Sequence, residues 1–242
     1  MTERPASQVF RDAETLQLGP SSVRWDGDEL VIRFDETTAP VPPMPMIPKR
    51  MRGTVRVRPR AINEIAFPLD DVGKHIWRPI APRSRVEVTL DDPSLSWTGE
   101  GYLDTNAGSE PMEDAFEVWD WSRAHLRQDS AVLYDLKRKD GTALSLALRF
   151  DKDAVPETVE PPPHALLPPT IWRMPRHTRA DAGRPVHVET TWEDTPFYSR
   201  STLSNHLLGE PCQAVHESLS LGRLRSPIVR AMLPFRMPRS LR

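Results

Sequence analysis

Apolar and polar residues alternate with a period of two along much of the chain. Residues 22–35 alternate on both sides of Asp26-Gly27, a pair that is typical of a two-residue hairpin turn. Residues 132–150 alternate on both sides of Asp140-Gly141 in the same way. Because successive side chains of a strand point to opposite faces, each alternation would bury one face of a strand. The pattern therefore predicts two β-hairpins.

Four shorter segments extend this prediction. Residues 53–58 and 86–90 alternate valine with charged or polar residues, and residues 113–123 and 186–191 are further strand candidates. Glycine and proline separate these segments, and short strands joined by such turns are typical of β-barrels and β-sandwiches. We therefore expect an all-β fold, an antiparallel barrel or sandwich.

Three segments depart from the alternation. Residues 38–48 and 153–169 are rich in proline, and each could be a linker, a sheet edge or a lid over an apolar pocket. Residues 219–242 contain six arginines and no acid among apolar residues. Such a short basic C-terminal helix or tail could lie on an anionic membrane surface, pack against the sheets or fray.

Composition narrows the classes of function. The chain has 242 residues and a net charge of -2, so it carries no electrostatic signature for nucleic acid. Its 26 prolines are about twice the usual share, which favours rigid loops. The single Cys212 excludes an intramolecular disulfide, and the seven histidines lack the spacing of metal ligands. Residues 1–10 lack the apolar region of a signal peptide, and we expect a cytoplasmic protein without a metal ion.

One acidic stretch is a candidate for chemistry. Between Val86 and Ser122 the chain has ten carboxylates, several aromatic residues, and no Lys, Arg or His. A carboxyl group that is desolvated against aromatic rings has a raised pKa, which makes it a proton donor near neutral pH. The alternative is a solvated acidic loop, which is the more common reason for such a run.

Two short spacings stand out around this stretch. His75 and Trp77 are two residues apart, as are Tyr102 and Asp104. In an extended chain such pairs project from the same face, so each pair would offer a ring and a polar group to a cavity. By the same rule Trp119 and Trp121 share a face, and the residue between them faces away. Any one of these pairs has an ordinary structural explanation as well.

The usual catalytic motifs are missing from the sequence. It has no nucleophile elbow, no phosphate-binding glycine loop, no dinucleotide fingerprint and no His-Glu-x-x-His. The remaining interpretation is acid chemistry between aromatic walls, without a cofactor.

Several blocks of sequence resemble the carotenoid 1,2-hydratase family, also called hydroxyneurosporene synthase. These blocks are WTGEGYLDTNAGSEPME at residues 97–113, WDWSR at 119–123, TPFYSR at 195–200, HESLSL at 216–221 and MLPFRMPR at 232–239. The resemblance covers most of the chain from about Trp77 onward. The wider group is lipocalin-like and includes tocopherol-cyclase-like and pericyclase-like relatives.

The resemblance implies a cofactor-independent hydro-lyase that adds water to the terminal C1–C2 double bond of an acyclic carotenoid such as neurosporene or lycopene. The family's His-x-Trp and Tyr-x-Asp elements match His75-Ile76-Trp77 and Tyr102-Leu103-Asp104. Asp104 would donate the proton, and Trp77 and Tyr102 would face the resulting cation. His75 would hold Asp104 or accept a proton from the attacking water.

The resemblance also implies partners and an organisation. Trp119 and Trp121 would line a tunnel for the polyene, and the protein would contact the membrane peripherally, because the substrate dissolves in the bilayer. Residues 1–80 would form an N-terminal lipocalin-like β unit that is incomplete at its start, residues 81–218 a second one, and residues 219–242 the basic tail. The rival functions are a carotenoid or isoprenoid carrier without catalysis, and an acid-catalysed prenyl cyclase that uses the same residues.

Overall fold

The computed structural model describes residues 4–37 and 49–232. The first proline-rich segment, residues 38–48, and the last ten residues of the predicted basic tail lie outside this range. The described part of the chain consists mainly of antiparallel β-strands, which confirms the predicted all-β class. Within that part neither large sheet closes on itself, so the sheets are open and do not form a barrel.

The chain forms two compact units. The first unit comprises Met1–Arg60, Arg83–Tyr102 and Arg230–Arg242, and the second comprises Ala61–Pro82 and Leu103–Val229. Two long strands, β7 (His75–Asp92) and β8 (Leu95–Gly108), run through both units. The domain division expected at residues 80 and 218 stays a prediction, because compact units are not independently folding domains.

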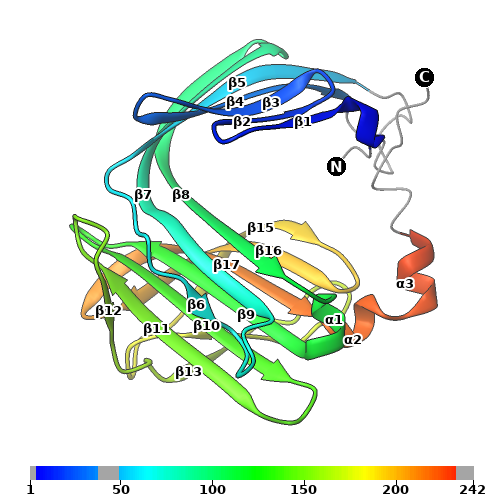
Figure 1. The fold of residues 1–242 in the computed structure, drawn as a ribbon. Helices are drawn as coiled ribbons and strands as arrows, with labels where there is room; N and C mark the ends of the chain where they lie inside the picture. Colours follow the sequence, from blue (N-terminus) through cyan, green and yellow to red (C-terminus); the bar gives the residue numbers. More distant parts are fainter. Residues whose placement is uncertain (1–3, 38–48, 233–242) are drawn as a thin grey trace. The chain divides into compact units, whose positions relative to one another are not determined.

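The first unit is built on one antiparallel sheet, shown with β2 to β5 side by side in Figure 1. Its strands before β7 are β1 (Val9–Arg11), β2 (Thr15–Leu18), β3 (Ser21–Asp26), β4 (Glu29–Thr37) and β5 (Arg50–Pro59). They pair in chain order, β5 pairs with β7, and β7 pairs with β8. The predicted hairpin at Asp26-Gly27 is confirmed, since Asp26 pairs with Glu29 and Gly27 has a φ of 66°.

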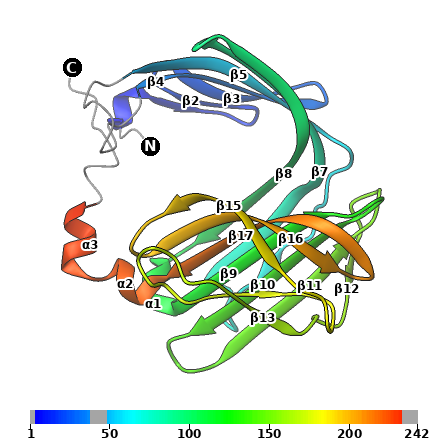
Figure 2. The ribbon, with the colours of Figure 1, turned by 180° about the vertical axis from the view of Figure 1, so that it is seen from behind.

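The second unit is built on a seven-stranded antiparallel sheet (Figure 2). In spatial order its strands are β12 (Pro156–Thr158), β11 (Ala143–Phe150), β10 (Ser130–Arg138), β9 (Phe116–His125), β17 (Glu210–Ser220), β16 (Tyr198–Leu207) and β15 (His187–Asp194). The predicted hairpin around Asp140-Gly141 is β10 and β11. A two-stranded sheet, β13 (His164–Leu167) and β14 (Arg176–Arg179), contacts β9 and β17 through β14.

Short elements complete the structure. The 3-10 helix η1 (Ala6–Gln8) precedes β1, and strand β6 (Phe67–Pro68) pairs with the start of β7. Helix α1 (Met112–Ala115) precedes β9, and α2 (Leu221–Leu224) and α3 (Pro227–Met232) follow β17. The last two are the described part of the predicted basic C-terminal segment.

Two segments differ from the sequence-based expectation. Residues 113–115 were expected in a strand but belong to α1, where the carboxylates of Glu113 and Asp114 lie in the first turn and favour the positive end of the helix dipole. Residues 153–169 contain the strands β12 and β13, so this proline-rich segment is partly a sheet edge. Prolines at the start of a strand and between strands leave the ladder hydrogen bonds intact.

Residues on β9 divide into two buried faces. Ala124 shares one face with Leu133 and Leu203, in an apolar cluster next to the two-stranded sheet. Trp119 and Trp121 lie on the opposite face, as the alternation predicted. Both faces are buried, so the sheet separates an apolar and polar layer on one side from an aromatic layer on the other.

Candidate active site

The two sequence pairs meet through one hydrogen bond. The indole Nε1–H of Trp77 donates to Oδ2 of Asp104 over 2.9 Å. Trp77 is fully buried on β7, and Asp104 is half-buried on the neighbouring strand β8. An indole N–H can only donate, so this bond suits a carboxyl oxygen in either protonation state and fixes the orientation of the group.

Aromatic rings surround this bond. The ring of Tyr134 lies 4.8 Å from that of Trp77 and 5.4 Å from that of Trp119, both edge to face. Phe116 lies 5.1 Å from Trp119 and 4.9 Å from the ring of His75. We call the rings of Phe67, Trp77, Tyr134, Trp119 and Phe116 the aromatic cluster. Its π faces are electron-rich and exclude water.

Tyr134 and Asn106 belong to this site, although the sequence analysis did not select them. The Tyr134 hydroxyl donates to Oδ1 of Asn106 over 3.4 Å, and Asn106 lies two residues after Asp104 on β8. Burial, with the nearby negative charge of Asp104, raises the pKa of Tyr134 above its usual range. Tyr134 is therefore a neutral hydrogen-bond donor. The same two-residue spacing that selected Tyr102 would have included Asn106.

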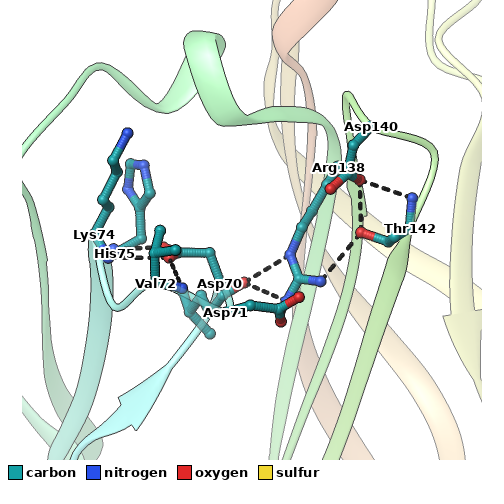
Figure 3. Close-up of polar contacts among 9 residues, drawn as sticks. Asp70, Asp71, Val72, Lys74, His75, Arg138, Asp140 and Thr142 are labelled. Carbon is teal, nitrogen blue, oxygen red and sulfur yellow. Dashed lines mark hydrogen bonds and ion pairs between the residues drawn. The ribbon is translucent and has the colours of Figure 1, made fainter.

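A tight turn positions His75 at the start of β7. Oδ1 of Asp70 accepts backbone N–H bonds from Val72 and Lys74, both 3.0 Å, and Oδ2 accepts one from His75, 2.6 Å (Figure 3). Burial raises the pKa of Asp70, but these three donors outweigh it and hold the pKa below its usual range. Gly73 completes the turn with a φ of 70°, a value that favours glycine.

Arg138 on β10 ties this turn to the seven-stranded sheet. Its guanidinium donates to the Leu69 carbonyl from Nε, 3.2 Å, and from Nη2, 3.0 Å (Figure 3). The same guanidinium lies 3.4 Å from Asp71. The turn that carries His75 is thus fixed to β10 as well as to its own backbone.

His75 faces a different carboxylate from the one expected. Its Nε2 lies 3.7 Å from Oε1 of Glu110, and Oε2 of Glu110 forms an ion pair with Lys74, 2.6 Å. His75 is buried, with a relative exposure of 3%. Trp77, rather than His75, donates the hydrogen bond described above to Asp104.

A cavity of about 260 Å³ adjoins these groups in the second unit. Polar side chains from His75, Asn106 and Glu110 line it, together with Trp119 and apolar residues. Pockets that enclose a whole drug-sized ligand usually measure about 300–1,000 Å³, so this cavity suits one end of a long molecule.

The remaining predicted residues have different positions. Trp119 lines the cavity, and Trp121 is buried on the same face of β9. Tyr102 is half-buried on β8 at the boundary of the first unit, whereas the other three predicted catalytic residues lie in the second. The roles of all six residues stay predictions.

A buried polar chain lies on the other face of β9, and the sequence analysis did not anticipate it. Ser218 donates to Oδ1 of Asp120 over 2.5 Å, and Nε2 of His216 lies 3.0 Å from the Ser218 hydroxyl. Burial raises the pKa of Asp120 to about 7 and lowers that of His216 to about 3. The only sequence signal was the position of Asp120 between two tryptophans on an alternating strand.

Most of the acidic stretch is not a proton donor. Arg58 pairs with Glu87 at 2.8 Å, and other cations from distant positions reach further acids of the stretch. These pairs are Arg52–Asp91, Arg83–Glu100, Lys74–Glu110 and Lys137–Glu117. The stretch lacks cations in sequence, but folding brings them from neighbouring strands.

Metal-binding and membrane-spanning elements are both missing from residues 4–37 and 49–232. These residues contain no group of three or more His, Cys, Asp or Glu side chains arranged to hold a metal ion. No helix in this part of the chain combines the length and the apolar character needed to cross a membrane.

Known proteins resemble this chain in sequence and in fold. It is 50% identical to acyclic carotenoid 1,2-hydratase of Thiocapsa roseopersicina and 45% identical to that of Rubrivivax gelatinosus, over 99% of this chain in each case. The chain spans 58% of the length of each of these two relatives.

The crystal structure of CghA with Sch210972 matches 88% of this chain and 69% of its own, at 12% identity and a TM-score of 0.53. At that identity the match shows the fold alone, which is lipocalin-like as expected. The family model described as carotenoid hydratase CrtC matches residues 1–242. On this evidence the chain belongs to the carotenoid hydratase CrtC family.

Proposed function

We propose that this protein adds water across the terminal C1–C2 double bond of an acyclic carotenoid and forms a tertiary alcohol. The proposal is supported by the family and by the two relatives that are named acyclic carotenoid 1,2-hydratases. The observation that carries it is the hydrogen bond from Trp77 to Asp104 beside the aromatic cluster. Neurosporene and lycopene are the substrates to test.

Asp104 is the proton donor in this proposal. A trisubstituted alkene has no polarised bond for a base to attack, so hydration begins with protonation at the less substituted carbon. The Trp77 N–H holds Oδ2 of Asp104 in a fixed direction. Positioned acids of this kind contribute roughly 10²–10⁴-fold to a rate.

The tertiary cation that forms would be stabilised by the rings of Trp77, Tyr134 and Trp119. Each ring presents a negative π surface, and a desolvated cation–π contact contributes about 2 kcal/mol or more. The carboxylate that Asp104 becomes after giving up its proton adds a compensating charge. Water then captures the cation from the cavity side.

A direct experiment separates this function from its two rivals. The purified chain is incubated with lycopene or neurosporene in lipid vesicles, and the pigments are extracted and weighed by mass spectrometry. A hydratase gives a product that is heavier by one water for each reacted end. A cyclase gives an isomer of unchanged mass with a shifted absorption spectrum, and a carrier returns the substrate unchanged, so either result would reject hydration.

We also propose that the protein is cytoplasmic and attaches to a membrane surface through the loop between β13 and β14. Ile171 is 89% exposed and Trp172 is 47% exposed on this loop. Arg223 on α2 donates to the carbonyls of Trp172, 2.8 Å, and Arg173, 3.1 Å. Exposed apolar and tryptophan side chains beside arginines are typical of surfaces that bind the headgroup region of a bilayer.

A further inference from the structure

His75 is held so tightly that its two ring nitrogens face fixed directions. Its backbone N–H is bonded to Asp70, and the edge-to-face contact with Phe116 restricts its ring. On the other side lies Gly108 of β8, where a methyl group added at Cα would come within 2.9 Å of Nδ1 and 3.2 Å of Cε1. The absence of a side chain at Gly108 therefore leaves space next to Nδ1.

The other ring nitrogen faces Glu110. Nε2 of His75 is buried and has no hydrogen-bond partner in the part of the chain that the structure describes. Oε1 of Glu110 lies 3.7 Å from it, about half an ångström beyond the usual hydrogen-bond range. A buried polar nitrogen without a partner is costly, and catalytic hydrogen bonds are often long before they tighten around a substrate.

Lys74 explains why Glu110 points toward His75. The ammonium group of Lys74 binds Oε2 of Glu110 at 2.6 Å, which leaves Oε1 on the side of the histidine. Lys74 is also fixed at its backbone, where its N–H donates to Asp70 and its carbonyl accepts from Ser109. The carboxylate and the imidazole are thus anchored to the same turn.

We propose that Glu110 is a positioning residue that accepts Nε2–H of His75, so that Nδ1 is the base for the water that adds to the cation. This inference rests on the proposed hydratase function. The hydrogen bond made by one imidazole nitrogen decides which nitrogen carries the proton, so a Glu110 partner at Nε2 leaves the lone pair on Nδ1. That nitrogen faces the space beside Gly108.

The proton balance of the step is complete. Asp104 gives its proton to the alkene carbon and becomes a carboxylate. The water oxygen forms a bond to the cation as one of its protons moves to Nδ1 of His75, and the negative charge of Glu110 stabilises the imidazolium. The imidazolium then releases its proton to solvent and Asp104 takes one up, so the net reaction is alkene plus water to alcohol.

The test compares Glu110→Gln with a matched control, Glu117→Gln. Both glutamates form a 2.6 Å ion pair with a lysine, but Glu117 pairs with Lys137 and does not line the cavity. Reactions run in D2O, and mass spectrometry measures both the hydrated product and deuterium in the recovered carotenoid. Deuterium enters the recovered pigment when the alkene is protonated and the cation loses a proton again.

We expect Glu110→Gln to slow hydration by at least tenfold, while deuterium uptake persists and its ratio to hydration rises above that of wild type. Glu117→Gln should behave as wild type. A second variant, Gly108→Ala, should give the same changed ratio, because its methyl group fills the space beside Nδ1. Melting temperatures check that each variant is folded.

Two results would overturn the inference. One is wild-type hydration in Glu110→Gln, and the other is an equal loss of hydration and deuterium uptake, which would place Glu110 at the protonation step or in general structure. If the wild-type chain neither hydrates nor exchanges any acyclic carotenoid, the proposed function fails first and this inference fails with it.

Discussion

At the scale of single residues, the site depends on what an indole N–H can do. Trp77 can donate a hydrogen bond but cannot accept one, so it orients Asp104 without competing for the proton that the carboxyl group would deliver. Its buried ring also contacts Tyr134 at 4.8 Å. Trp77 therefore combines an orienting bond with a wall of the aromatic cluster, and the two roles can be separated by mutation.

Trp77→Phe keeps an aromatic ring and removes the N–H group. We expect hydration of lycopene to fall roughly tenfold, because losing one hydrogen bond costs about 1–1.5 kcal/mol, and about 1.4 kcal/mol corresponds to a tenfold change in rate. Carotenoid binding, followed by pigment absorbance after gel filtration, should remain. Initial rates from mass spectrometry provide the measurement.

Trp192→Phe is the matched control, because Trp192 also donates from its indole nitrogen, in this case to Thr202 over 2.7 Å. It is 70% exposed on the edge strand β15 and should change neither rate nor binding. Equal rates for Trp77→Phe and wild type would show that the orienting bond contributes nothing.

Residue spacing predicted part of this site, for a reason that also limits it. The i, i+2 rule identifies which side chains share a strand face, so His75 with Trp77, and Tyr102 with Asp104, could be selected from sequence. The rule does not say which residues of two strands lie opposite each other. For that reason the contact of His75 with Glu110, and the place of Tyr134, required the structure.

At the scale of elements, β9 carries two different environments. Its Trp119 face belongs to the aromatic cluster, and its Asp120 face joins β17 through Ser218 and His216. Both titratable groups on the Asp120 face are neutral around pH 5 to 6, because burial raises the pKa of Asp120 to about 7 and lowers that of His216 to about 3. Their effects on stability have opposite signs.

The signs follow from the unfolded values. Unfolded, Asp120 ionises near 3.8, so between that pH and about 7 the unfolded chain gives up a proton that the folded protein keeps, and stability falls as pH rises. Unfolded, His216 takes up a proton below about 6.5 while the folded protein does not until about 3, so stability falls as pH drops through that window. In the wild-type protein the two trends oppose each other.

Asp120→Asn should expose the histidine trend. Relative to wild type, its free energy of unfolding should rise between pH 4 and pH 8 by up to about 4 kcal/mol, since one pKa unit corresponds to about 1.36 kcal/mol. Urea unfolding at several pH values measures this difference. Asp153→Asn, at an exposed carboxylate paired with Lys152, should show no such pH dependence. A pH-independent difference for Asp120→Asn would contradict the assignment.

Elements with strong local signals were the ones that sequence predicted correctly. The hairpins at Asp26-Gly27 and Asp140-Gly141 combine a turn pair with alternation on both sides. Helix α1 was missed because its four residues continue directly into the alternation of β9. Strands β12 and β13 were hidden by prolines, whose exclusion from central strands does not apply at edges and strand starts.

At the scale of the whole molecule, the function requires access to a substrate that dissolves in membranes. We expect the double variant Ile171→Ser with Trp172→Ser to bind anionic vesicles at least fivefold more weakly than wild type, because both apolar side chains lose their contact with the bilayer. Vesicle sedimentation measures the bound fraction. Trp192→Ser, at another exposed tryptophan, should bind as wild type. Unchanged binding of the double variant would place the membrane contact elsewhere.

Family membership could be predicted from sequence because several separate blocks match at once, and the family model confirms it over residues 1–242. The open form of the sheets could not, because alternation gives the faces of each strand and does not determine whether the first and last strands meet. The cations that neutralise most of the acidic stretch were equally hidden, since they come from distant strands such as β5 and β10.

The central claim is that Asp104 donates the proton that starts hydration. The measurement that tests it most directly is the rate at which Asp104→Asn converts lycopene to a product heavier by one water, next to wild type and with pigment binding measured in the same samples. The account predicts a loss of at least 100-fold with binding retained. Hydration at the wild-type rate in the asparagine variant would contradict it.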